Sequence, residues 1–193
     1  MKRIFVVHGW QGHPDEVWFP WLKNELENRG FQVSLLQMPD TEYPVIEKWV
    51  PYLANAVGDA DEQTYFVGHS IGCQAILRYL EALPSNIKVG GAVFVAGFLH
   101  LTGVEKPDEV LMCWPWINNS IDFEKVRTHT NNFIAIFSDN DIFVPLTNEK
   151  LFEQNLKAKT VVLHNMNHFN NKRNPQYKQI PAILNLFLEI ADK

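Results

Sequence analysis

The sequence predicts an α/β fold in which about six mostly parallel strands are flanked by helices on both faces. Two observations support this class. Short runs of β-branched and aromatic residues alternate with amphipathic segments along the chain, a pattern typical of parallel strands joined by crossover helices. Several of these runs are apolar at nearly every position, as strands covered on both faces should be. The 193 residues suit a single compact domain, 1–193, without disulfide or metal support.

The expected strands are the runs rich in Val, Ile, Leu, Phe and Tyr, residues that fit a pleated and buried surface. In chain order they are Arg3–His8, Gln32–Gln37, Thr64–Gly68, Val89–Ala96, Asn132–Ser138 and Thr160–His164.

The expected helices have apolar residues three and four positions apart, which places them on one face of a helix. They are Trp21–Arg29, Val45–Val57, Ser70–Leu83, Phe123–His129, Thr147–Leu156 and Ile180–Ala191. Pro51 interrupts the second helix, which we expect to kink there or to begin at that proline.

The segment Phe98–Ser120 follows neither the helical nor the strand period. An irregular stretch of this length in a compact domain is typical of a lid or a binding loop. A short helix that the periodicity does not reveal is the alternative, and the sequence leaves both open.

Composition excludes several classes of partner. The chain has 17 basic and 22 acidic residues, a net charge of −5, and no run of Lys or Arg, so we expect no nucleic-acid or anionic-membrane binding. Cys73 and Cys113 are too few for a disulfide framework and lack the spacing of a zinc or redox motif. The apolar run that follows Met1-Lys2-Arg3 is too short for a signal peptide, so we expect a cytoplasmic protein.

One motif carries chemistry. Gly68-His69-Ser70-Ile71-Gly72 matches G-x-S-x-G between a predicted strand and a predicted helix, the setting of a nucleophile elbow. In such an elbow a strained turn presents the serine hydroxyl at the carboxyl end of the strand. The alternative is an ordinary strand-to-helix loop in which Ser70 caps the helix.

A serine needs a base to take its proton and a third group to orient that base. The sequence offers Asp139 and Asp141 after the strand that ends at Ser138, and His164 and His168 at or after the last strand. The order Ser, Asp, His is the one expected for α/β-hydrolases.

With these motifs the chain resembles an α/β-hydrolase, and within that superfamily the small serine hydrolases of the RBBP9/YdeN type. The resemblance covers nearly the whole length and rests on His8-Gly9, Trp18-Phe19-Pro20-Trp21-Leu22, the elbow, Asp141 with Pro145, and His168-Phe169. It implies a sheet that lacks the first strands of larger relatives.

By position, the resemblance assigns the acid to Asp141 and the base to His168. Asp139 is the rival acid, with the alternative role of a turn residue that bonds its own backbone. His164 is the rival base, with the alternative role of a half-buried histidine satisfied by backbone.

The oxyanion formed in such a reaction needs N–H donors, and the fold supplies the backbone N–H of Ile71. The resemblance adds the backbone N–H of Trp10. Aromatic residues could line an acyl pocket, but we expect only Trp10 near the site. The aromatic residues considered are Trp10, Trp18, Trp21, Phe98, Trp114 and Trp116.

No metal or cofactor is expected. His164 and His168 have the i, i+4 spacing that binds zinc on a helix, but they follow a predicted strand and have no evident third ligand.

The sequence therefore predicts a serine hydrolase that cleaves a small carboxylic ester or related acyl compound through Ser70, His168 and Asp141. Two alternatives stay open. One is a protein-binding module on a hydrolase scaffold, although no sequence feature indicates a protein partner. The other is amidase, thioesterase or acyltransferase chemistry with the same residues.

Overall fold

The structure is a computed structural model that describes residues 1–172 and 174–192, and its framework is a six-stranded sheet in the order β2-β1-β3-β4-β5-β6. All neighbouring strands are parallel, so the predicted fold class is confirmed, with every pair parallel. The strands are β1 (Arg3–Val7), β2 (Gln32–Leu36), β3 (Thr64–His69), β4 (Gly91–Val95), β5 (Phe133–Ser138) and β6 (Lys159–Leu163).

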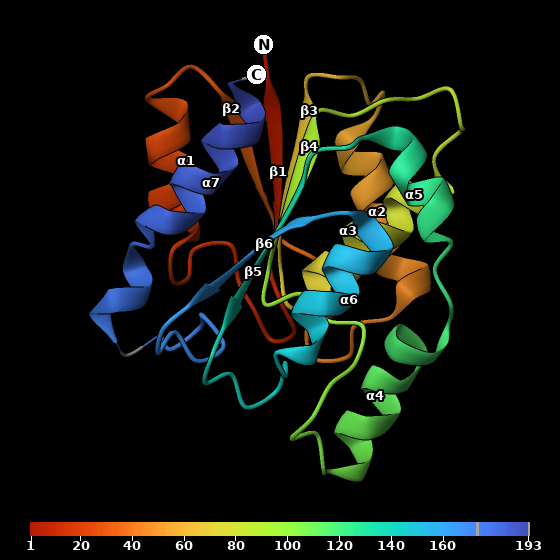
Figure 1. The fold of residues 1–193 in the computed structure, drawn as a ribbon, viewed down its shortest axis with the longest axis vertical. Coiled ribbons are helices and arrows are strands. Elements are labelled where there is room, and N and C mark those ends of the chain that lie inside the picture. The colour runs from red at the N-terminus through yellow and green to blue at the C-terminus, as the bar shows by residue number, and fades with distance from the viewer. Residues whose placement is uncertain (173, 193) are drawn as a thin grey trace.

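Helices cover both faces of this sheet (Figure 1). On one face lie α1 (Phe19–Glu27) and α7 (Pro181–Ala191), and on the other lie α2 (Ile46–Val57), α3 (Ile71–Ala82), α5 (Phe123–His129) and α6 (Thr147–Leu156). A short 3₁₀ helix, η1 (Pro175–Lys178), precedes α7. Each face contributes one hydrophobic core, which explains why the strands read as continuous apolar runs.

Burial follows position in the sheet. Every residue of the central strands β3, β4 and β5 is buried, whereas the edge strand β2 is buried only at Val33 and Leu36 and the edge strand β6 has no buried residue. Edge strands have a neighbour on one side only.

The expected elements are present, and most of their bounds differ from the predicted ones by one or two residues.

Pro51 does not start α2, so that part of the prediction is wrong. The helix begins at Ile46, because the N–H groups of Lys48 and Trp49 both donate to the Val45 carbonyl and close the first turn before the proline. Trp49 and Leu53 are fully buried on either side of Pro51. Their packing holds the helix against the sheet across the position where the proline lacks an N–H.

The segment Phe98–Ser120 contains a helix that its periodicity did not reveal, α4 (Pro107–Asn118). Pro107 opens it, and Asp108 and Glu109 in its first turn suit the positive end of the helix dipole. Only Cys113 and Trp116 are buried within it, which explains why no apolar period is visible. In Figure 1 α4 (green) projects away from the helices that cover the sheet.

The C-terminal end of α4 is attached to the body of the protein. Arg78 of α3 donates to the carbonyls of Trp116 (3.0 Å) and Asn119 (2.8 Å). The Trp116 indole N–H donates to the Pro44 carbonyl (2.9 Å) and its ring packs edge-on against Trp49. In the part of the chain that the structure describes, no helix is long and apolar enough to cross a membrane.

The approach of α3 to β1 gives a first prediction. A Cβ added at Gly72 would lie 2.3 Å from the Val7 oxygen and 2.6 Å from the His8 oxygen, and both are backbone atoms that cannot rotate away. We expect Gly72→Ala to lower the free energy of unfolding by about 2 kcal/mol or more, measured by urea denaturation.

Gly58→Ala is the control, because Gly58 has φ +64° with nothing within 4 Å of its added Cβ. This variant should cost only the backbone strain, about 1 kcal/mol. Equal losses of stability in the two variants would mean that the contact between α3 and β1 is not tight.

Candidate active site

Ser70 lies in a strained turn between β3 and α3. Its backbone has φ 54° and ψ −122°, a conformation that residues other than glycine rarely adopt. The turn requires Gly68, because a Cβ there would lie 2.9 Å from both the N and Cα of Cys73. Ser70 occupies the N-cap position of α3, but its side chain makes no capping hydrogen bond. The capping-serine alternative is therefore wrong, and the hydroxyl is available for another partner.

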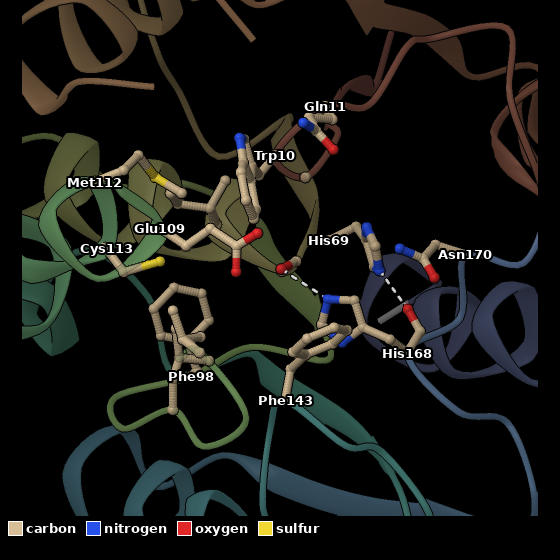
Figure 2. Close-up of a pocket in the computed structure, with 15 residues that line it drawn as sticks. Trp10, Gln11, His69, Phe98, Glu109, Met112, Cys113, Phe143, His168 and Asn170 are labelled. Carbon is tan, nitrogen blue, oxygen red and sulfur yellow. Dashed lines mark hydrogen bonds between the residues drawn. The ribbon is translucent and has the colours of Figure 1, made fainter. Parts of the chain in front are cut away.

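That partner is His168, in the loop after β6. The His168 Nε2 lies 2.9 Å from the Ser70 Oγ (Figure 2), and its Nδ1 lies 2.7 Å from the Asp141 Oδ2. The Asp141 side chain is only 1% exposed, and its Oδ1 accepts hydrogen bonds from the N–H groups of Phe143 and Val144. An Nδ1–H donated to Asp141 leaves the Nε2 lone pair free to accept the serine proton.

Asp139 and His164 form a separate pair outside this chain of hydrogen bonds. The His164 Nδ1 bonds the Asp139 Oδ2, and the Asn165 N–H donates to the Asp139 Oδ1 (2.8 Å). This backbone bond, followed by His164, lowers the pKa of Asp139. Asp139 also bonds its own backbone, as its alternative role requires, whereas the alternative of a half-buried His164 is wrong. Because β6 ends at Leu163, His164 is already in the turn, with its side chain 80% exposed.

Side chains at the end of β5 and in the loop after it hold the backbone of residues 164–169, the loop that carries His168 (the histidine loop). The Met166 N–H donates to the Ser138 hydroxyl (2.9 Å), and the Asn167 N–H donates to the Asn140 Oδ1 (2.7 Å). The Asn140 amide donates in return to the Asn167 Oδ1 (3.2 Å). Asn165, Asn167 and Phe169 all have positive φ, so the loop depends on these contacts to keep an uncommon backbone path.

His69 is a site residue that sequence reasoning missed. Its Nε2 lies 2.8 Å from the His168 carbonyl oxygen, to which it donates. Burial, with a smaller contribution from His168, lowers the pKa of His69 to about 3, so the ring is neutral. The only signal in the sequence was its place directly before Ser70 in the elbow motif.

On the other side of His168, the Trp18 indole donates to the Phe169 carbonyl (3.2 Å), and Phe169 is fully buried. His69 and Trp18 thus hold two consecutive carbonyls of the histidine loop.

The two predicted oxyanion donors lie beside Ser70. Ile71 is the first residue of α3, a position whose N–H has no acceptor within the helix. The peptide between Gly9 and Trp10 is fixed by its carbonyl, which accepts from the His8 Nδ1 (2.8 Å) and the Gly12 N–H (3.1 Å).

Because the N–H of a trans peptide points opposite to its carbonyl, the Trp10 N–H is directed away from His8 and Gly12. Within the described residues it donates to no protein acceptor. The buried His8 ring accepts the Met38 N–H at Nε2 (3.1 Å), which leaves the proton on Nδ1. Burial lowers the pKa of His8 and favours this neutral form.

A pocket of about 190 Å³ opens over Ser70. It is lined by Gly9, Trp10, Gln11, His69, Ser70, Ile71, Phe98, Leu101, Val104, Glu109, Met112, Cys113, Phe143, His168 and Asn170. Phe98 lines it together with Trp10, so the expectation that only Trp10 is near the site is wrong. Trp18 and Trp116 are core residues, and Trp114 is 61% exposed. The segment 98–120 contributes to this pocket, as its interpretation as a binding segment expected, but the sequence did not show which of its residues line the pocket.

Within residues 1–172 and 174–192, no group of three His, Cys, Asp or Glu side chains is arranged to hold a metal ion. His164 and His168, the pair with zinc-like spacing, bond two different carboxylates instead. Cys73 and Cys113 are both free and buried.

Comparison with known proteins places this arrangement in context. A family model described as serine hydrolase matches residues 4–189. YdeN of Bacillus subtilis (strain 168) is 32% identical over 169 residues, which cover 87% of this chain and 86% of YdeN. The serine hydrolase RBBP9 of Rattus norvegicus is 26% identical over 167 residues, which cover 86% of this chain and 81% of RBBP9.

Solved structures agree with these matches. The crystal structure of the B. subtilis ydeN product covers both chains completely, with a TM-score of 0.89 at 28% identity. Est1E from Butyrivibrio proteoclasticus, solved with ferulic acid bound, has a TM-score of 0.76 at 16% identity over 100% of this chain and 90% of its own. The last likeness concerns the fold alone. The resemblance to the RBBP9/YdeN type of α/β-hydrolase is confirmed.

The lowered pKa of His69 predicts how stability depends on pH. Between about pH 6.5 and 3 the unfolded chain binds a proton at residue 69 that the folded chain does not, so stability contributed by neutral His69 is lost as pH falls through this window. In urea denaturation at about pH 7.5, 5.5 and 4.5, we expect the free energy of unfolding of His69→Gln to fall less steeply. The difference in slope should approach about 1 kcal/mol per pH unit.

Glutamine keeps a donor near the position of Nε2 but does not titrate. Identical slopes for the wild type and His69→Gln would show that His69 is not held neutral by burial.

Proposed function

This chain belongs to the serine hydrolase family, and on that premise we propose that it cleaves a small carboxylic ester or a related acyl compound through Ser70, His168 and Asp141. One observation carries the proposal: a continuous chain of hydrogen bonds, 2.9 Å and 2.7 Å long, joins Ser70 through His168 to the buried Asp141. Related acyl compounds include amides and thioesters, which the same three residues can cleave.

In the first step the Ser70 Oγ forms a bond to the carbonyl carbon while the His168 Nε2 takes the hydroxyl proton. The tetrahedral intermediate then collapses. The bond between carbon and leaving-group oxygen breaks, and His168 returns its proton to that oxygen, which releases an alcohol and leaves the acyl group on Ser70. Asp141 stabilises the imidazolium through the Nδ1–H and holds the ring in position.

In the second step water attacks the acyl-enzyme. His168 takes a proton from the water as its oxygen bonds to the carbonyl carbon, and then gives that proton back to the Ser70 Oγ as the ester bond breaks. The products are a carboxylic acid and the free enzyme. Serine, histidine and aspartate supply the nucleophile, the base and the orienting charge, so the proposed reaction includes no metal or cofactor.

The developing oxyanion is assigned to the backbone N–H groups of Ile71 and Trp10. Both lack a protein acceptor in the arrangement described above, and fixed donors of this kind need no reorganisation when negative charge develops. The peptide of Trp10 is held by His8 and Gly12, which supports a preorganised donor.

The size of the pocket supports a small substrate. Its volume of about 190 Å³ is below the roughly 300–1,000 Å³ typical of sites for drug-sized ligands. Phe98, Leu101, Met112 and Phe143 give it an apolar wall, which suits the hydrocarbon part of an acyl group.

Labelling with a fluorophosphonate probe tests the nucleophile. We expect the probe to modify Ser70 alone, detected by mass spectrometry of the digested protein, because among the residues that the structure describes only Ser70 bonds a histidine held by a buried carboxylate. Ser70→Ala, checked for folding by circular dichroism, should abolish labelling. Modification of another serine, or none in folded protein, would contradict the proposed function.

Substitution of the two aspartates tests the acid. We expect Asp141→Asn to lower kcat about 10⁴-fold in steady-state ester hydrolysis, the scale known for the serine-protease triad, because an amide cannot fix the same histidine tautomer. Asp139→Asn is the matched control, since it removes a carboxylate two residues away that contacts His164 instead. It should retain activity within about threefold, because its partner pair is exposed and weak. The reverse ranking would assign the acid to Asp139.

A further inference from the structure

Glu109 is a pocket residue for which the proposed reaction has no role. It lies in the first turn of α4 and lines the same pocket as Ser70 and His168. Figure 2 shows its side chain reaching into the pocket, with the carboxylate directed to the centre between Trp10 and Phe98. Among the described lining residues it is the only Asp, Glu, Lys or Arg. A carboxylate placed against a mainly apolar wall loses hydration, so its presence requires an explanation.

The partner of Glu109 does not remove this charge. The Lys106 Nζ lies 2.8 Å from the Glu109 Oε1, but the Lys106 side chain is 79% exposed whereas that of Glu109 is 23% exposed. An ion pair between neighbours on a helix, with one member largely in water, contributes little. Within the described residues, the second oxygen, Oε2, has no hydrogen-bond partner. It is therefore available to a ligand.

The field of this carboxylate reaches other groups in the pocket. The pKa of the Cys113 thiol is raised to about 11, first by burial and then by the negative charge of Glu109. Cys113 lines the same pocket as Ser70. A group that disfavours a thiolate there also disfavours any other negative charge formed nearby.

The proposed reaction forms such a charge, because the tetrahedral intermediate carries an oxyanion next to Ser70. With a neutral acyl group bound, the Glu109 carboxylate repels that oxyanion. With an anionic acyl group bound, it repels the acyl group as well. A substrate with its own positive charge reverses the balance, since its ammonium group binds the carboxylate and offsets the repulsion. The Glu109 carboxylate loses hydration in the free enzyme, but its charge lets the enzyme favour ammonium substrates over neutral ones.

We propose that Glu109 is a specificity-determining residue that selects acyl compounds with an ammonium group in the acyl part, close to the scissile carbonyl. This inference rests on the proposed function and adds a substrate class to it. The ammonium group bonds the Oε2 of Glu109, in part replacing the Lys106 side chain, while the rest of the acyl group contacts the apolar wall.

Pairs of esters that differ only by an ammonium group in place of a methyl group test the proposal. Two spacings are used: ethyl glycinate with ethyl propanoate, and ethyl 3-aminopropanoate with ethyl butanoate, each at a pH where the amine is protonated. For each pair we define the charge ratio as kcat/KM for the ammonium ester divided by kcat/KM for the neutral ester. The intrinsic reactivity of the esters cancels when the charge ratios of two variants are compared.

We expect Glu109→Gln to lower the charge ratio at least tenfold for one or both spacings, by slowing the ammonium ester and not the neutral one. Asp108→Asn is the matched control, because it removes the same charge from the neighbouring position, which is exposed and outside the pocket lining. Its charge ratio should stay within twofold of the wild type. Lys106→Gln removes the competing ammonium group and should raise the charge ratio.

An unchanged charge ratio at both spacings in folded Glu109→Gln, or equal effects of Glu109→Gln and Asp108→Asn, would overturn this inference. If Glu109→Gln does not fold, the Lys106→Gln variant tests the inference independently. A charge ratio that falls in Lys106→Gln also contradicts the inference. Fluorophosphonate labelling of Ser70 is measured in each variant. Labelled enzyme without charge selection disproves the role of Glu109 alone, whereas wild-type protein without labelling disproves the proposed function.

Discussion

The left-handed backbone at Ser70 is the constraint on which the rest of the site depends. With φ at 54°, the chain turns from β3 into α3 without using the serine hydroxyl as a helix cap, and the Oγ stays free to meet His168. The turn is possible only because Gly68 and Gly72 let the helix approach the sheet, where any Cβ would meet backbone atoms. Strain of this kind persists when the surrounding structure compensates for it. Here the fully buried strands β3 and β4 provide that support.

Three of the buried histidines, those around the site, have three different roles, and their hydrogen-bond partners decide which. His8 is held neutral by burial and uses both ring nitrogens to fix the turn that carries Trp10. His69 is also neutral and donates to the carbonyl of His168. His168 alone lies between a carboxylate and a hydroxyl, so it alone is arranged to accept and return a proton. Burial of a histidine therefore does not identify a base, whereas its pair of partners does.

The pocket is formed by residues that the sheet and its loops hold firmly and by residues of the peripheral helix α4. Ser70, His69 and His168 are held by the sheet and by loops with many hydrogen bonds, whereas Glu109 and Met112 belong to α4, which is attached mainly through Arg78 and Trp116 near its C-terminal end. Residues that perform chemistry need fixed geometry. Residues that contact the variable part of a substrate do not, and they are commonly found on peripheral segments such as this one.

The sequence by itself determined the fold class, the order of the strands and of most helices along the chain, and the proposed nucleophile Ser70, because hydrophobic periodicity and the G-x-S-x-G turn are local properties of the chain. Position after the strands, together with the resemblance, favoured Asp141 over Asp139 and His168 over His164, but no local pattern shows which aspartate meets which histidine. The tertiary structure shows which side chains meet, because β6 ends at Leu163 and turns His164 to solvent beside Asp139, while the loop beyond it carries His168 to Asp141. It also placed His69 and Glu109 at the pocket. The contact of His69 with His168 joins residues far apart in sequence, and Glu109 lies on a weakly buried helix without an apolar period.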